Sequence, residues 1–352
     1  MKRISFLDNV RSLAIFLVVL CHSIEFLYDG EALTVASPAM VNFSAILFNF
    51  TRLGVPLFLF LSGYLLLDKD YKTEKDVFNF WKTKLLPVVI TWVLWIVLFY
   101  IFSCWKDGLS FSVKDFVLKL FMVERVNISH DWYMYMLIGL YFIFPFLSMF
   151  LKKFSLRMHV IVFGGAFFIC MVIPSLAALT GKNLYLFSAV SSFFINTNYC
   201  YIIYAVLGYF LKKYEKLSLN LPINLIGFMF SMTAMVLCGY YRHSIMLSYY
   251  LWYDFALLPF ASVFLFNLLR GVKLPLLIEK VNGRISICSF GMYLVHVPIL
   301  CVLIRFFPEF NSNQPLSSIV YLAVAFIASY VLVEIIGKIK YLNKNLFMIK
   351  NK

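Results

Sequence analysis

The chain has 352 residues, of which 62% are hydrophobic, 19% aromatic and 14% charged, with 31 Lys and Arg against 17 Asp and Glu. A water-soluble domain carries about 25% charged residues, so this composition excludes a soluble protein and indicates an integral membrane protein. The net charge of +14 does not indicate nucleic-acid binding, because the basic residues lie between apolar segments rather than on one folded face.

Hydropathy along the chain predicts an all-α integral membrane protein with about ten transmembrane helices, each of about 17–25 residues, the length that a bilayer requires. We find no soluble domain, internal repeat or low-complexity tract, and we expect residues 1–352 to form one membrane domain. The predicted spans centre near Leu17, Phe58, Leu94, Leu140, Phe168, Ala205, Met229, Phe260, Leu294 and Ala325.

The distribution of basic residues predicts the topology. With the amino terminus inside, the inner segments hold 22 Lys and Arg residues and the outer segments hold 7. Positive charge is enriched in cytoplasmic loops of membrane proteins. We therefore predict that both termini are cytoplasmic.

The first span, SFLDNVRSLAIFLVVLCHSIEF, carries four ionisable residues. Each costs about 2.5–3.5 kcal/mol at the centre of a bilayer on insertion scales. Arg11 and His22 are eleven residues apart, so they share a helix face and lie about 16 Å apart along its axis. Asp8 precedes Arg11 by three residues and Glu25 follows His22 by three, which completes one polar stripe. The stripe either pairs with neighbouring helices or lines a polar cavity, and we favour the cavity.

The second span, RLGVPLFLFLSGYLL, places Arg52 at its outer entrance. Pro56 can kink the helix, and the small pair Ser62 and Gly63 permits close approach of a neighbouring helix. An interfacial arginine often extends to the membrane surface without any further role.

Later spans add polar residues at the same predicted depth as His22. The fourth opens with HDWYMYMLIGLYFIFPF, which places His130 and Trp132 at the outer boundary. Aromatic anchoring at the interface accounts for Trp132 but not for His130. The ninth, SICSFGMYLVHVPI, places Tyr293 and His296 on one face in its outer half.

The seven cysteines are odd in number and no two have C-x-x-C spacing. We therefore expect neither a disulfide framework nor a metal site, and no bound cofactor.

Four of these blocks together resemble the membrane acyltransferase 3 family. LDNVRSLAIFLVVLCH, with Arg-x10-His, is similar to the family's signature, and RLGVPLFLFLSGYLL, HDWYMYMLIGLYFIFP and SFGMYLVHVPI resemble its next blocks in order. The resemblance covers nearly the whole chain. It is closest to stand-alone members that acetylate surface polysaccharides such as enterobacterial common antigen. It differs from larger members, which carry a periplasmic esterase-like domain.

The resemblance implies acyl transfer, commonly from acetyl-CoA, to a hydroxyl of a surface or lipid-linked glycan, by a multi-pass protein of the bacterial inner membrane. His22 is then the expected general base, since an imidazole titrates near neutral pH, and Glu25 would orient it. Arg11 would meet the polyanionic acyl-CoA donor. The remaining assignments are donor binding by Asp8 and Ser62 and an acceptor side formed by Arg52, His130, Trp132, Tyr293 and His296. Tyr293 or Arg52 would stabilise the oxyanion.

The alternative function is transport of a glycan or its lipid-linked precursor, because transporters also carry charged residues inside their membrane helices. Transporters often contain inverted repeats, and we find no matching halves in this sequence. A purely structural membrane protein would explain the spans but not the polar stripe.

Overall fold

The computed structural model describes residues 4–28, 38–126, 128–180, 200–215, 220–246, 251–307 and 315–349. These residues form helices and no strand. The α-helices are α1 (Ser5–Tyr28), α2 (Pro38–Thr51), α3 (Gly54–Leu66), α4 (Glu74–Phe80), α5 (Leu86–Asp107), α6 (Val113–Leu120), α7 (Trp132–Lys153), α8 (Leu156–Phe167), α9 (Ile173–Thr180), α11 (Cys200–Lys213), α12 (Leu221–Met246), α13 (Leu258–Arg270), α14 (Leu276–Phe306), α15 (Pro315–Ile336) and α16 (Lys340–Phe347). Two π-helical turns, η2 (Trp81–Leu85) and η3 (Phe168–Val172), join α4 to α5 and α8 to α9.

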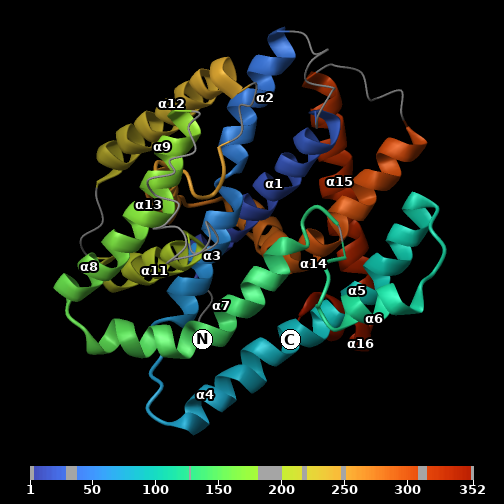
Figure 1. The fold of residues 1–352 in the computed structure, drawn as a ribbon, viewed down its shortest axis with the longest axis horizontal. Coiled ribbons are helices and arrows are strands. Elements are labelled where there is room, and N and C mark those ends of the chain that lie inside the picture. The colour runs from blue at the N-terminus through green and yellow to red at the C-terminus, as the bar shows by residue number, and fades with distance from the viewer. Residues whose placement is uncertain are drawn as a thin grey trace.

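Helix α1 lies at the centre of the bundle, between α2, α3, α13, α14 and α15 (Figure 1). In its apolar window, 78% of residues are buried, against 22% for the windows of the peripheral spans that contain α8 and α12. A polar stripe on a helix in this position faces protein rather than lipid, which removes most of the insertion penalty.

Eight helical segments among the described residues are long and apolar enough to cross a membrane. The sequence predicted about ten. The two predicted spans near Ala205 and Phe260 correspond to α11, with 14 described residues, and to α13, with 13. At 1.5 Å per residue the described part of each extends about 20 Å, less than the apolar thickness of about 30 Å.

Helix α11 packs backbone to backbone against α3 through two glycines. A Cβ added at Gly63 would lie 1.7 Å from the carbonyl oxygen of Ala205, and one added at Gly208 would lie 2.2 Å from that of Phe60. Small residues allow such close approach between membrane helices. This contact confirms the packing role expected of Gly63.

Substitution of Gly63 by Ala is expected to destabilise the bundle by more than about 2 kcal/mol, because the α3 and α11 backbones must separate to admit a methyl group. Gly139→Ala in α7 is the matched control, since nothing lies within 4 Å of a Cβ placed there. Thermal unfolding of the two purified variants in detergent measures the difference. Equal melting temperatures would contradict the interlocked packing.

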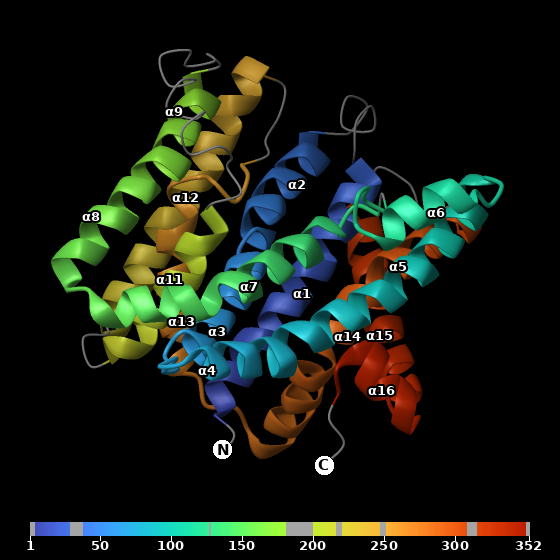
Figure 2. The ribbon, with the colours of Figure 1, turned by 60° about the horizontal axis from the view of Figure 1, so that its bottom comes forward.

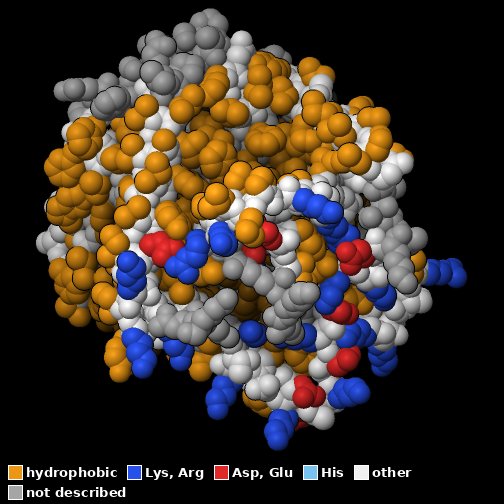
Figure 3. Space-filling view, turned by 180° about the vertical axis from the view of Figure 1, so that it is seen from behind, with side chains coloured by type: hydrophobic (Ala, Val, Ile, Leu, Met, Phe, Trp, Pro, Cys, Tyr) orange, Lys and Arg blue, Asp and Glu red, His pale blue; other side chains and the backbone are white. Residues whose placement is uncertain are grey.

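The outer surface of the bundle is apolar. Val160 and Ile161 on α8 are 63% and 59% exposed, and Ile226 and Phe230 on α12 are 68% and 71% exposed. Figure 3 shows hydrophobic side chains over the upper and left parts of one face, while Lys, Arg, Asp and Glu gather below them. Lipid is the solvent that stabilises such a surface.

The two ends of the described chain lie on the same side of the molecule (Figure 2). This arrangement agrees with an even number of crossings. That this side is cytoplasmic stays a prediction.

Candidate active site

One cavity of about 1480 Å³ inside the bundle is lined by most of the predicted site residues. Arg11 and His22, from the two halves of α1, both line it. Three of the four residues of the polar stripe, Arg11, His22 and Glu25, therefore face this cavity. The cavity is also lined by five further predicted residues: Arg52, Ser62, His130, Trp132 and Tyr293. Asp8 and His296 are not among the residues that line it.

At the Arg11 end, α1 is joined to α14 by hydrogen bonds. Arg11 Nη1 donates to Ser286 Oγ at 3.1 Å, and Ser286 Oγ donates to Asp8 Oδ1 at 2.6 Å. Asp8 Oδ1 also lies 3.9 Å from Arg11 Nη1. Asp8 thus contacts the Ser286 hydroxyl that holds Arg11 and does not itself line the cavity. Its predicted part in donor binding stays a prediction.

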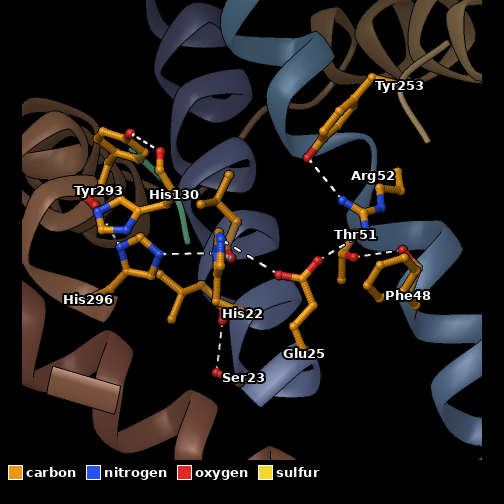
Figure 4. Close-up of polar contacts among 12 residues, drawn as sticks. His22, Ser23, Glu25, Phe48, Thr51, Arg52, His130, Tyr253, Tyr293 and His296 are labelled. Carbon is orange, nitrogen blue, oxygen red and sulfur yellow. Dashed lines mark hydrogen bonds and ion pairs between the residues drawn. The ribbon is translucent and has the colours of Figure 1, made fainter. Parts of the chain in front are cut away.

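At the other end, three histidines from three segments meet (Figure 4). The ring centroids of His22 and His296 are 4.9 Å apart, those of His130 and His296 are 5.0 Å apart, and those of His22 and His130 are 6.0 Å apart. His130 and His296 are at most 1% exposed. Burial and the two neighbouring imidazoles lower the pKa of His130, which precedes α7, well below its usual value.

The hydrogen bonds around His22 and His296 determine which nitrogen of His22 is the base. His296 Nδ1 lies 2.7 Å from the carbonyl oxygen of Tyr293, which can only accept, so this nitrogen carries the proton. A buried neutral imidazole then has its lone pair on Nε2, 3.2 Å from His22 Nδ1. His22 Nδ1 must donate, both there and to the Val18 carbonyl at 2.9 Å. In the neutral form of His22 the lone pair is therefore on Nε2, the nitrogen that faces Glu25.

Glu25 links His22 to Arg52. Its Oε2 lies 3.8 Å from His22 Nε2, and its Oε1 accepts a hydrogen bond from Arg52 Nη2 at 3.1 Å. At 3.8 Å the carboxylate is beyond hydrogen-bond distance of Nε2. It is placed to stabilise the imidazolium that forms when Nε2 takes a proton.

Arg52 is 2% exposed and lies in a break between α2 and α3. The break has a sequence cause: Pro56 has no N–H to donate to the carbonyl of Arg52, so the helical hydrogen-bond ladder is interrupted there. The guanidinium carbon lies 3.8 Å above the ring of Phe48, and Nη1 is 3.4 Å from the hydroxyl of Tyr253. Arg52 is thus an interior residue and not an interfacial one.

The aromatic residues of the predicted acceptor side also point inward. Trp132 is stacked on Tyr201, with ring centroids 5.4 Å apart, and contacts Tyr253 at 5.5 Å. It forms part of the cavity wall. The Tyr293 hydroxyl donates to the backbone carbonyl of His130 at 2.7 Å. Its single proton is therefore occupied, which argues against Tyr293 as the oxyanion donor.

Tyr293→Phe is expected to lower kcat by less than about tenfold, because it removes one hydrogen bond that holds His130 in place. Removal of a true oxyanion donor lowers kcat by about 10²–10³. Steady-state kinetics of the purified variant separates the two roles. A loss of a hundredfold or more with unchanged thermal stability would restore Tyr293 as a catalytic residue.

The family model for an acyltransferase domain matches residues 4–334 of the chain. The matched region contains the whole arrangement just described, from Asp8 to His296. The chain belongs to the acyltransferase 3 family. No curated protein and no solved structure gave a significant match. The resemblance seen in the four sequence blocks is thereby confirmed, and this acyltransferase 3 protein is a membrane acyltransferase in general terms.

Several residues at the site of this acyltransferase were not predicted. Tyr253 contacts Arg52, and Arg125 lines the cavity while its guanidinium is paired with Asp131. Lys84 and Lys344 line the cavity as well. In the sequence each of the cations belongs to a loop or tail with other charges, so no pattern distinguishes it from an ordinary surface residue.

Proposed function

We propose that the protein is an O-acyltransferase that transfers an acyl group, most simply acetyl, from cytoplasmic acyl-CoA to a hydroxyl of a surface or lipid-linked polysaccharide sugar. The observation that carries this proposal is the single cavity lined by Arg11 and by His22. In a bacterial inner membrane, its Arg11 end would face the cytoplasm and its histidine end the acceptor.

The acyl donor would enter at Arg11. CoA is polyanionic, and a guanidinium held by Ser286 and Asp8 is suited to bind a phosphate. The pantetheine arm is thin and would follow the cavity for the roughly 16 Å to His22. The thioester would then lie beside Nε2, with Ser62 in the wall between the two ends.

The chemistry proposed for His22 is general-base catalysis. Nε2 takes the proton of the acceptor hydroxyl as its oxygen attacks the thioester carbonyl, and Glu25 stabilises the imidazolium. A carbon–oxygen bond forms, the carbon–sulfur bond breaks, and the CoA thiolate leaves and takes up the proton from His22. The acceptor sugar would lie among Arg52, His130 and Trp132, with His296 holding His22 from behind.

Isolated membranes with and without the protein, incubated with radiolabelled acetyl-CoA, test this proposal. We expect label in the surface or lipid-linked glycan fraction only when the protein is present. Mass spectrometry of the same fraction would show an added acetyl group on a sugar. A glycan that is moved but never labelled would overturn the proposal and indicate transport.

A further inference from the structure

The carboxyl-terminal helix α16 contributes to the cavity although it lies outside the family domain. The family match ends at residue 334, and α16 spans Lys340–Phe347. Nevertheless Lys344 and the three residues Phe347, Met348 and Ile349 line the cavity. This part of the cavity wall therefore comes from a segment that follows the region matched by the family model.

Specific contacts hold α16 in this position. The indole Nε1 of Trp95 on α5 donates to the carbonyl of Leu346 at 2.9 Å. Phe347 is 1% exposed and lies where a side chain at Gly291 of α14 would be, 2.8 Å from an added Cβ. After Phe347 the chain turns back through Met348, whose φ is +53°. The buried ring of Phe347, packed against Gly291, shows that α16 is tightly packed against the rest of the bundle.

More basic than acidic side chains line the cavity, although Arg125 is paired with Asp131 and Arg11 lies near Asp8. The basic side chains are Arg11, Arg52, Lys84, Arg125 and Lys344, and Glu25 is the one acidic side chain among the described residues that line the cavity. Glu25 is already paired with Arg52. Arg11, Lys84 and Lys344 come from three elements, α1, η2 and α16, and so converge on the cavity from different directions. Such an arrangement of point charges favours a ligand with several negative groups.

We propose that α16 is a donor-recognition element: Lys344 binds a phosphate group of acyl-CoA, while Phe347, Met348 and Ile349 form the apolar wall beside its pantetheine arm. This inference rests on the proposed function and adds a specificity residue from outside the family domain. The contacts with Trp95 and Gly291 hold the helix, and with it the backbone of Lys344, beside the cavity. Thioesters without phosphates would gain nothing from it.

The test compares Lys344→Glu with Lys340→Glu in the full-length protein. Both lysines are exposed on α16, but only Lys344 lines the cavity. Each variant is assayed with acetyl-CoA and with acetyl-pantetheine, which carries the same thioester without the phosphates. For Lys344→Glu we expect KM for acetyl-CoA to rise about tenfold, the size of a lost charge-assisted contact. We expect kcat and the KM for acetyl-pantetheine to stay unchanged, and Lys340→Glu to match the wild type with both donors.

The outcomes separate this inference from the proposed function. If the wild type acetylates glycans from acetyl-CoA and both variants behave alike, the role of α16 is overturned and the proposed function stands. If Lys344→Glu raises KM equally for both donors, its contact is not with phosphate and the inference fails. If the wild type uses neither donor, the proposed function fails and this inference with it.

Discussion

Replacement of His22 by Ala is expected to lower kcat by about 10²–10⁴, the contribution typical of a positioned general base. In its neutral form His22 carries its lone pair on Nε2, because its Nδ1 donates to the Val18 carbonyl and to His296. No other group in the described wall combines that position with a lone pair held next to a carboxylate. Glycan acetylation by equal amounts of inserted protein is the measurement.

His159→Ala is the control for the loss of a buried histidine. His159 lies on α8 against Phe150 and Phe210, with ring centroids 5.9 and 5.7 Å away, and it does not line the cavity. We expect this variant to keep its activity per folded molecule. Activity of His22→Ala above a tenth of the wild-type value would remove the base from the mechanism.

Arg52→Leu is expected to reduce the free energy of unfolding by about 2–4 kcal/mol. It leaves the Glu25 carboxylate without its partner inside the bundle, and breaking a buried ion pair is strongly destabilising. The lower part of the usual range applies because the Glu25 side chain is 26% exposed. Thermal unfolding in detergent gives the stability, and acetylation by the folded fraction gives the activity, which we expect to fall as well.

The double variant Arg52→Leu with Glu25→Gln distinguishes a specific pair from general damage. Each single variant leaves one charge unpaired, whereas the double variant removes both. The loss of stability in the double variant should therefore be smaller than the sum of the single losses by about 1–3 kcal/mol. Its activity should still be lower than that of the wild type, since the carboxylate beside His22 is gone. Additive losses would contradict the Glu25–Arg52 ion pair.

The polar stripe on α1 could be predicted from the sequence because it depends only on helical periodicity. Arg11 and His22 are on one face in any α-helix, and an ionisable face in a membrane helix must be turned away from lipid. The four family blocks likewise predicted the family. The arrangement of His22, His130 and His296 could not be derived in this way, since it depends on how α1, α14 and the segment before α7 pack together.

Two other features also depended on packing. The segments around Ala205 and Phe260 are apolar enough to predict spans, but hydropathy does not distinguish a lipid-facing helix from a short one buried in protein. The position of Lys344 in the cavity wall could not be predicted, because a basic tail is typical of an ordinary cytoplasmic end. Aromatic anchoring at the interface accounts for Trp132 without any site, and only the packing shows that its ring lies against Tyr201 in the cavity wall, on the predicted acceptor side.

The central claim is that one cavity carries the acyl group from the Arg11 end of the bundle to His22 at the other end. A sided assay in sealed proteoliposomes tests it most directly, with acetyl-CoA confined to one compartment and the glycan acceptor to the other. We predict acetylated glycan when donor and acceptor are on opposite sides, in one orientation only. Product formed only when both are in the same compartment would contradict a route through the protein.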